Sequence, residues 1–358
     1  MSMLACACGV LVSCGGSGGT SHTIGGAHQA SVSAPFRFFS PSSFWNKPLA
    51  ADAPLDPSSP ALIAAFDAQI ETEEHTNNGP WINTVKSGIP VYTVPADQRT
   101  VPVRLAHHTP EPALSEAWDA VPLPSDAKPA TGRDGSLAVW QPSTDRLWEF
   151  HRLVHSVNGW SAVWGGAMRD VSSQSGVYQY GVWPGAKPWW GISASSLSLV
   201  GGLISIEDVE RGEINHALEM SLPERSGTFY ATPARRTDGT SMNPLALPEG
   251  AHLRLNPNLD LSALHLPKST LILAEAAQRY GIFITDGTGT SGVSTFFAQD
   301  PTPTGTNPYV GADGFFEGVS PRQLLAAFPW DQLQVLKLER HRGRSLAERA
   351  RTRARENL

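Results

Sequence analysis

The sequence predicts a mainly β protein, a jelly-roll-like β-sandwich with a few short helices. Three observations carry this prediction. The chain of 358 residues contains 33 Gly and 29 Pro but only 17% charged residues, which indicates many turns and few long helices. Apolar and polar residues alternate over several short runs, which is the period of a half-buried strand. Asn158-Gly159 stands between two such runs, and this pair is the strongest short signal for a β-hairpin.

Composition divides the chain into four segments. Residues 1–14 are mostly small and apolar and end in LVSC, which predicts a secretory signal with a lipobox and lipidation of Cys14; an ordinary secretory signal is the alternative. Residues 15–35 are rich in Gly, Ser, Thr and His and are expected to form a flexible tether. A single β-rich domain is predicted over residues 36–336 and a basic tail over residues 337–358. We therefore expect an exported protein, either extracellular or anchored to a membrane through an N-terminal lipid.

The charge and cysteine pattern narrows the chemistry. Cys6, Cys8 and Cys14 are the three cysteines, so the predicted domain has no thiol, disulfide or thiolate metal site. The tail carries eight Lys or Arg against three Glu, although the whole chain has a net charge of −6. Such a tail is either a solvated extension or a contact for an anionic surface. No stretch of about 18 apolar residues follows the N-terminal segment, so no other membrane span is predicted.

The first part of the domain is expected to contain one helix and two strands. Pro60 begins a helix over residues 61–71, in which apolar side chains recur at helical spacing. Residues 91–94 and 101–105 alternate as short strands. The proline-rich stretch 110–133 shows no period and is expected to be a surface loop.

The clearest β region is a predicted three-stranded meander over residues 137–140, 146–154 and 160–167. In its middle strand Glu149 and His151 share one face, about 7 Å apart by strand geometry. Charged side chains within an apolar strand would suit the floor of a half-open groove. An ion pair on a solvated sheet face is the alternative.

The stretch 189–222 is expected to present a histidine. Ser205 and Asp208 have the spacing of a capping box and Gly212 that of a helix end, so a short helix is predicted between them. Beyond Gly212 the period becomes two, and His216 shares its face with four apolar side chains. His216 is therefore either a core histidine with satisfied ring nitrogens or an acid, base or substrate donor in a groove.

A series of short motifs spans roughly residues 44–297. The phrase G-x-I-x-H-A-L occupies residues 212–218, and it is followed by Pro233-Ala234, by Leu253-Arg254-Leu255, by a helix ending in Tyr280-Gly281 and by a strand ending at Asp286. In this order the motifs resemble a largely uncharacterised family of secreted bacterial and fungal β-rich proteins. The resemblance implies a shared fold and an extracellular setting, and it assigns no catalytic residue.

The last third of the domain is expected to alternate helices and strands. A helix is predicted from residue 269 or 270 to Tyr280, with Gly281 as its stop. Strands are predicted over 282–285 and 293–297, and Pro321 opens a last short helix.

Several cofactor motifs fail on context. Gly287 to Gly292 satisfies G-x-G-x-x-G, but a strand is predicted after it, which offers no helix N-terminus to a pyrophosphate. His107-His108 has no acidic or histidine partner at ligand spacing. We therefore expect neither a cofactor nor a metal.

A set of carboxylates and histidines among aromatic residues remains, and it predicts a carbohydrate-active protein whose partner is a polysaccharide or glycan and not a nucleic acid. The leading hypothesis is a glycoside hydrolase that cleaves envelope or environmental polysaccharide by a carboxylate pair centred on Glu149. The candidate catalytic residues are Glu149, His151, His216, Asp145 and Glu213. The candidate substrate-binding residues are Trp148, Trp160, Trp164, Trp190, Asn215 and Arg152.

Two alternatives stay open. A polysaccharide lyase would use a histidine base such as His216, with Asn215, Arg152 and Tyr178 to neutralise a uronate. A non-catalytic surface lipoprotein would bind glycans through its tryptophans alone. A sandwich fold is compatible with all three functions.

Overall fold

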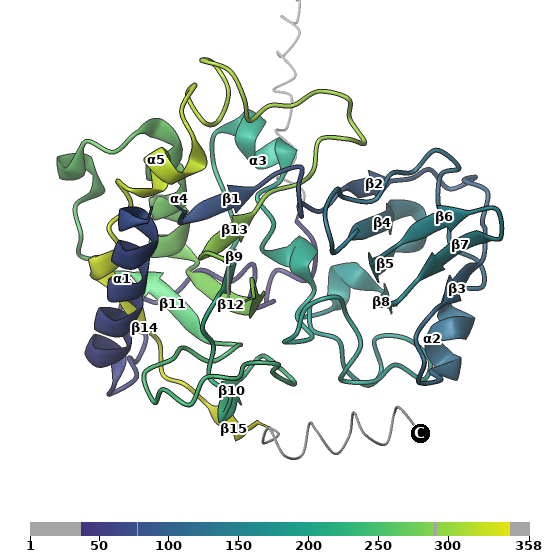
Figure 1. Cartoon of the computed structure of the whole chain (residues 1–358), viewed down its shortest axis with the longest axis horizontal. Helices are drawn as coiled ribbons and strands as arrows, with labels where there is room; N and C mark the ends of the chain where they lie inside the picture. The colour runs from purple at the N-terminus through teal and green to yellow at the C-terminus, as the bar shows by residue number, and fades with distance from the viewer. Residues whose placement is uncertain (1–36, 77, 290–291, 344–358) are drawn as a thin grey trace, which may run out of the picture. The chain divides into compact units, whose positions relative to one another are not determined.

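A computed structural model describes residues 37–76, 78–289 and 292–343, and over these residues the fold is mainly β, as the sequence predicts (Figure 1). Its sheets are compatible with a β-sandwich and do not close into a barrel. The helices are short apart from the first: α1 (Ser59–His75), α2 (Pro112–Ala117), α3 (Ile206–Arg211), α4 (Lys268–Arg279) and α5 (Pro321–Leu325). Single 3-10 turns lie at Pro142–Thr144, Val171–Ser173, Leu199–Gly201, Leu261–Leu264 and Trp330–Gln332.

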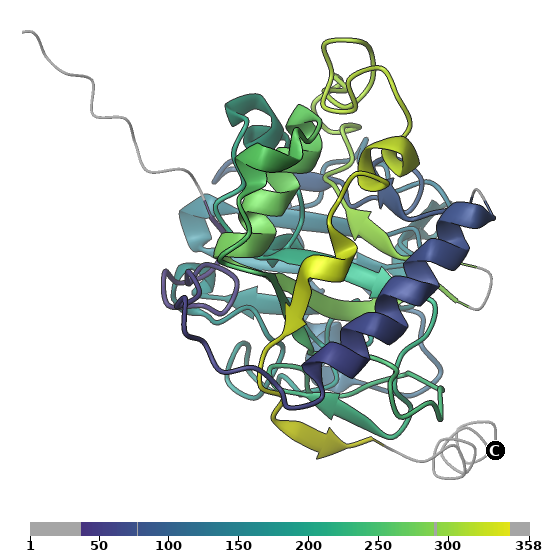
Figure 2. The same cartoon turned by 90° about the vertical axis from the view of Figure 1, so that its left-hand side faces the viewer.

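The largest sheet has six strands in the order β1-β13-β9-β12-β11-β14. The central strands β9 and β12 are parallel, whereas β11 runs antiparallel to both β12 and β14. Helices α1, α4 and α5 pack on one face of this sheet over a single apolar core, and Figure 2 shows α1 and α4 lying across it. The strands are β1 (Trp81–Asn83), β9 (Leu218–Leu222), β11 (His252–Leu255), β12 (Ile282–Gly287), β13 (Thr295–Phe297) and β14 (Leu333–Val335).

The other strands form a four-stranded sheet, β2-β4-β5-β8, a three-stranded sheet, β3-β7-β6, and the pair β10-β15. Their main core is rich in tryptophan and includes Phe283, which lies on the opposite face of β12 from the helices. The ring centroid of the fully buried Trp45 is 5.1 Å from that of Phe283. The strands are β2 (Val91–Thr93), β3 (Val103–Leu105), β4 (Leu137–Gln141), β5 (Arg146–His151), β6 (Val154–Ser156), β7 (Gly159–Ala162), β8 (Trp164–Arg169), β10 (Phe229–Ala231) and β15 (Arg340–Arg342).

The predicted meander differs from the structure after its second strand. Strand β5 pairs with β4 and β8 and ends at His151, because Arg152 adopts the left-handed region with φ of 51° and turns the chain aside. Strands β6 and β7 form the predicted Asn-Gly hairpin, but in the three-stranded sheet. His151 therefore lies at a strand end. In the stretch 110–133, expected to be loop, Pro112 begins helix α2 in the position that proline favours.

Helix α3 begins with the predicted capping box. The hydroxyl of Ser205 accepts a hydrogen bond from the backbone N–H of Asp208 at 3.0 Å, and the Asp208 carboxylate accepts one from the backbone N–H of Ser205 at 3.0 Å. Gly212 follows the helix with φ of 72°, a left-handed conformation that favours glycine. The sequence therefore specifies both ends of this helix.

Replacing Ser205 by alanine is expected to lower the free energy of unfolding by about 1 kcal/mol, because the N–H of Asp208 loses its acceptor. Urea denaturation of Ser205→Ala against the parent chain measures the change. Ser125→Ala removes an exposed loop hydroxyl and is expected to change stability by less than about 0.5 kcal/mol. Equal stability of Ser205→Ala and the parent would show that the cap contributes nothing measurable.

The fold continues past the boundary predicted at residue 336. Arg340 forms an ion pair of 3.2 Å with the buried Asp56, and β15 pairs antiparallel with β10 up to Arg342. The first residues of the expected tail are thus part of the β structure. Residues 344–358, together with the predicted signal and tether, lie outside the described residues.

Candidate active site

A β-bulge in β12 turns Asp286 away from the core. Ile282 and Ile284 point into the core beneath the helices, so a regular strand would place residue 286 on the same face. The register with β9 shifts between Ile284 and Asp286, and Asp286 pairs with Ser221 instead. Asp286 and Ser221 both line a cavity. The extra residue at the bulge therefore moves a carboxylate from the core face to the cavity face.

This cavity, here named the acidic pocket, has a volume of about 360 Å³. It lies where the ends of β12 and β5 meet the loop around residue 193. The hydroxyl of Ser221 is buried and has no hydrogen-bond partner among the described residues, so it can serve a ligand. The polar residues that line the pocket are Ser87, Asp134, Ser136, His151, Ser193, Ser221, Arg236, Asp238 and Asp286.

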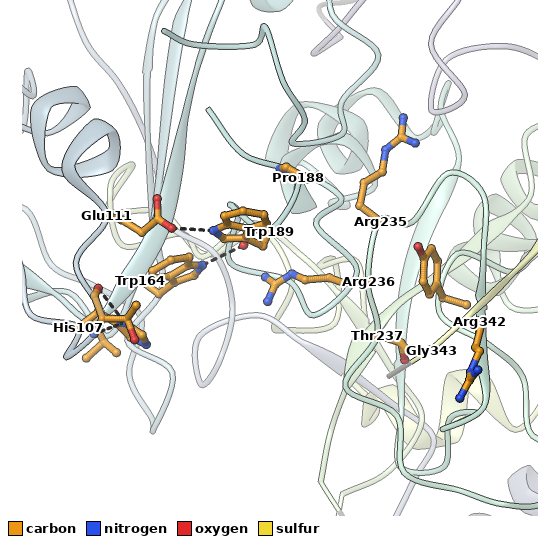
Figure 3. A pocket seen from close by; sticks show the side chains of 13 residues that line it. His107, Glu111, Trp164, Pro188, Trp189, Arg235, Arg236, Thr237, Arg342 and Gly343 are labelled. Carbon is orange, nitrogen blue, oxygen red and sulfur yellow. Dashed lines mark hydrogen bonds between the residues drawn. The ribbon is translucent and has the colours of Figure 1, made fainter. Parts of the chain in front are cut away.

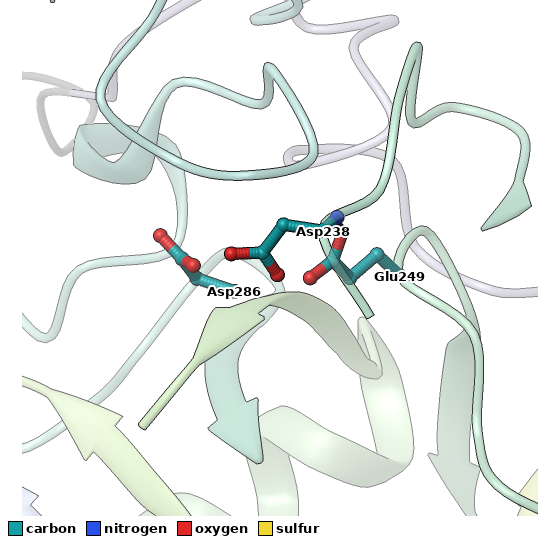
Figure 4. Close-up of side chains that lie close together, drawn as sticks. All are labelled: Asp238, Glu249 and Asp286. Atoms are coloured by element: carbon teal, nitrogen blue, oxygen red, sulfur yellow. Dashed lines mark hydrogen bonds between the residues drawn. The ribbon is translucent and has the colours of Figure 1, made fainter. Parts of the chain in front are cut away.

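Three carboxylates meet beside the acidic pocket. One carboxylate oxygen each from Asp238, Glu249 and Asp286 lie within 4.8 Å of one another, and Figure 4 shows Asp238 between the other two. Arg225 donates to Asp238 at 2.6 Å and to Glu249 at 3.4 Å. A Cβ at Gly287 would meet the Arg225 guanidinium, so any larger residue next to Asp286 would have to displace the end of the Arg225 side chain.

The same three carboxylates are the only group of potential metal ligands in the part of the chain that the structure describes. Oxygen ligands of this kind suit a hard cation such as Ca²⁺. However, the guanidinium of Arg225 already donates to Asp238 and Glu249 and supplies positive charge there. The arrangement therefore fits an acid and base pair better than a metal centre.

Burial and neighbouring charges shift the pKa values of the pocket's titratable groups. Withdrawal from water, helped by the charge of Asp238, raises the pKa of Asp286 to about 7. Burial and the same neighbour raise the pKa of Glu249 well above its usual range. Burial lowers the pKa of His151, which keeps its ring neutral at pH 7. Near pH 7, Asp286 is thus protonated in about half of the molecules, and in these it can donate a proton.

Figure 3 shows a larger cavity of about 800 Å³, here named the aromatic pocket. Trp164 and Arg236 line both this cavity and the acidic pocket. The indole N–H of Trp164 donates to the Trp189 carbonyl at 3.3 Å, and that of Trp189 donates to Glu111 at 2.8 Å. These bonds hold both rings in place. The lining residues are His107, Thr109, Glu111, Val163, Trp164, Pro188, Trp189, Tyr230, Arg235, Arg236, Thr237, Arg342 and Gly343.

Glu149, on which the sequence hypothesis is centred, is fully buried and lines neither pocket. Its carboxylate accepts hydrogen bonds from the Tyr178 hydroxyl at 2.7 Å and from the backbone N–H of Leu199 at 3.1 Å. Burial raises its pKa to about 7. The structure therefore places Glu149 inside the core and away from both pockets. His151, two residues on, does line the acidic pocket.

His216 is a core histidine, the first of its two alternatives. One ring nitrogen lies 3.1 Å from the Asp208 carboxylate and the other 2.9 Å from the Ala217 carbonyl. Burial disfavours the imidazolium, but the Asp208 charge and hydrogen bond outweigh burial and raise the pKa of His216. The ring connects α3 to β9 and lines neither pocket.

The other two candidate catalytic residues lie away from the pockets. Asp145, in the turn before β5, accepts hydrogen bonds from the backbone and hydroxyl of Ser172, the latter at 2.6 Å. Glu213 is exposed and 3.8 Å from the Arg279 guanidinium. Both carboxylates serve local structure.

Among the candidate substrate-binding residues, Trp164 alone lines either pocket. Trp148 and Trp190 are buried in the core, and Trp160 stacks on His155 with ring centroids 4.4 Å apart. Asn215 is buried beside Tyr280, and Arg152 is exposed at the left-handed end of β5. Tryptophan density thus reflects core packing more than a sugar platform.

Sequence reasoning missed Asp238, Asp286, Arg236 and Trp189. A carboxylate at the end of an apolar strand was visible at Asp286, and Arg235, Arg236 and Asp238 follow the Pro233-Ala234 motif closely. Neither signal shows that the two segments meet, because that contact depends on tertiary structure.

Comparison with family models, with curated proteins and with solved structures gave no significant match to this chain. Within the described residues, none of the helices combines the length and the apolar character needed to cross a bilayer. Cys14, the predicted lipidation site, lies outside the described residues.

Proposed function

We propose that the protein is an exported glycoside hydrolase in which Asp286 is the general acid and Asp238 the nucleophile. The observation that carries the proposal is the pair itself: two carboxylates within 4.8 Å beside an open pocket, one of them with a pKa of about 7. A hydrolase needs such a pair, with one member protonated and the other available to the anomeric carbon.

The reaction follows from the roles of the two groups. Asp286 donates its proton to the glycosidic oxygen as the bond to the anomeric carbon breaks, and Asp238, oriented by Arg225, attacks that carbon to form a glycosyl ester. Asp286, now a carboxylate, takes a proton from water, which hydrolyses the ester and restores both groups. One oxygen of Asp286 lies within 4.8 Å of one oxygen of Asp238, which is shorter than the roughly 6.5–9.5 Å between the carboxyl groups of inverting enzymes. Retention of the anomeric configuration is therefore expected.

The proposal that the protein is exported rests on its N-terminal segment. A lipobox ending at Cys14 and a tether over residues 15–35 support an exported lipoprotein held at a membrane surface. An envelope or environmental polysaccharide is the polymer that such a protein meets. A shared extracellular setting is also what the resemblance to the G-x-I-x-H-A-L proteins implies.

A product assay with the full chain tests this proposal. Neutral and uronate-containing polysaccharides are incubated with the protein while new reducing ends and ultraviolet absorbance of unsaturated ends are followed. We expect reducing ends without absorbance, and an NMR spectrum of the first product with the anomeric configuration retained. An inverted product would exclude Asp238 as nucleophile, and no cleavage of any polymer would favour the glycan-binding alternative.

One observation favours a polysaccharide lyase as the second candidate. His151 is neutral at pH 7, lines the acidic pocket and shares it with Arg236, which suits a base and a group that neutralises a uronate. This assignment replaces His216, which the core encloses. Absorbance that appears together with reducing ends, and that His151→Ala abolishes, would favour the lyase.

A further inference from the structure

We propose that the glycan recognised by this protein is anionic, and that arginines of the aromatic pocket bind its carboxylate or sulfate groups. The inference rests on the proposed function, because it names the class of polysaccharide that is led into the acidic pocket. The residues that line the aromatic pocket support this inference, and so do Trp164 and Arg236, which line both cavities.

Two tryptophans of the aromatic pocket are placed to hold a sugar ring. The side chain of Trp189 is 40% exposed, and its carbonyl is tied to the indole of Trp164. His107 supports Trp164 from one side with ring centroids 4.9 Å apart. Fixed, partly exposed indoles offer a flat apolar surface to the C–H face of a sugar ring. A pocket of about 800 Å³ has room for more than one ring.

Three arginines bring positive charge to the aromatic pocket. Arg235, Arg236 and Arg342 all line the aromatic pocket. Arg235 donates to the neutral Gln179 at 2.6 Å, and Arg236 to the hydroxyl of Ser196 at 2.8 Å.

Within the described parts of the chain, none of the three arginines is ion-paired, whereas Arg211 and Arg225 each contact two carboxylates. Arg236 is partly compensated by the charges of Asp238, Glu249 and Asp286, and Glu111 adds one negative charge to the same cavity. Arg235 and Arg342 leave a local excess of positive charge there, on a chain of net charge −6, which favours an anionic ligand.

Arg236 and Arg342 lie on different sides of the aromatic pocket. Figure 3 shows the Arg236 side chain directed toward Trp164 and Trp189, with Arg342 on the far side of the cavity. Arg342 lies in β15 and pairs with Phe229 of β10, and the next residue of β10, Tyr230, also lines the cavity. A chain of sugars that lies on the tryptophans therefore meets an arginine on each side. Trp164 and Arg236 then lead it to the acidic pocket.

An anionic glycan fits both pockets better than a nucleic acid does. The acidic pocket is lined by Asp134, Asp238 and Asp286, which would repel a polymer with a phosphate at every residue. A glycan can combine acidic and neutral rings, so the arginines can hold an acidic ring in the aromatic pocket while a neutral ring occupies the acidic pocket. The carboxylates of the acidic pocket then stabilise the positive charge that develops at the anomeric carbon.

Binding of the full chain to polymers embedded in native gels tests the inference independently of cleavage. The polymers are a polyuronate, a sulfated galactan, a neutral glucan and single-stranded DNA. We expect the anionic glycans to bind about tenfold more tightly than the glucan, with the preference reduced in 0.5 M NaCl by screening. Arg235→Ala and Arg342→Ala are each expected to weaken anionic binding by about three- to tenfold. Arg104→Ala, a matched change on the exposed face of β3, is expected to have no effect.

The variants also separate charge recognition from stacking. Trp189→Ala is expected to weaken retention by neutral and anionic glycans alike, whereas the arginine variants act on the anionic glycans alone. Preference for the polyuronate over the galactan assigns carboxylates, and the reverse assigns sulfates. Equal retention by the neutral glucan, no effect of either arginine variant, or tighter binding of DNA would overturn the inference.

The test distinguishes this inference from the proposed function. Arginine-dependent binding of anionic glycans without any cleavage would leave the substrate class standing and remove the hydrolase. Cleavage restricted to neutral glycans would do the opposite.

Discussion

Asp286→Asn is expected to lower kcat by about 10²- to 10⁴-fold, the usual contribution of a general acid, while the protein still folds and binds its glycan. Asparagine has the shape of aspartate but no proton to give to the glycosidic oxygen. Because the pKa of Asp286 is raised to about 7, the wild-type rate should fall as pH rises through about 7 and the acid loses its proton. Initial rates of reducing-end release over a pH series measure both effects.

The control for this prediction is the same chemical change at a carboxylate outside the pockets. Asp145→Asn alters the turn before β5, where the side chain accepts hydrogen bonds from Ser172. Its expected kcat is within about twofold of wild type, because Asp145 does not touch the substrate. Equal activity of Asp286→Asn and wild type would exclude Asp286 as the acid, and loss of activity in Asp145→Asn would restore the sequence-based candidate.

Glu149→Gln is expected to change how stability depends on pH. The pKa of Glu149 is about 7 in the folded protein and about 4.5 when the chain is unfolded. Below pH 4.5 both states hold the proton. As pH rises from 4.5 to 7 only the unfolded state releases it, so stability falls by about 3 kcal/mol in total, and above pH 7 the loss is complete.

Urea denaturation between pH 4.5 and 8 measures this effect. The stability curve of Glu149→Gln should fall by about 3 kcal/mol less than that of the wild type over this range. The buried carboxyls of Glu219 and Glu249, whose pKa values are raised well above normal by burial, contribute a fall in the same direction in both proteins. Glu116→Gln, on the exposed side of α2, controls for the loss of one carboxyl group. Parallel curves for Glu149→Gln and wild type would contradict the prediction.

Local rules predict the regular elements well because the forces that form them are local. The capping box at Ser205 and the proline that opens α5 are short-range patterns, and both are present in the structure. The alternation in β5 correctly puts Glu149 and His151 on one face. Period alone does not show that both faces of β5 are covered, so a groove was predicted where the structure has a core.

The site itself depends on contacts that sequence spacing does not encode. Asp238 follows β10 and Asp286 lies near the end of β12, and Arg225, whose guanidinium lies beside Gly287, donates to Asp238. Each of the two aspartates is visible in the sequence as a charged residue after an apolar or proline-containing stretch. Which of the chain's 33 Asp and Glu residues gather at one cavity follows only from the sheet order.

The bulge in β12 makes the number of residues in this strand part of the active site. Thr285 is the extra residue of this bulge, and a strand that kept Thr285 but paired regularly with β9 would carry Asp286 into the apolar core beneath α1 and α4, where an unpaired carboxylate costs several kcal/mol. The direction in which Asp286 points therefore depends on the irregular pairing of β12 with β9 as well as on the residue at position 286. Design on this scaffold therefore has to conserve the bulge in β12 before it considers the composition of the strand.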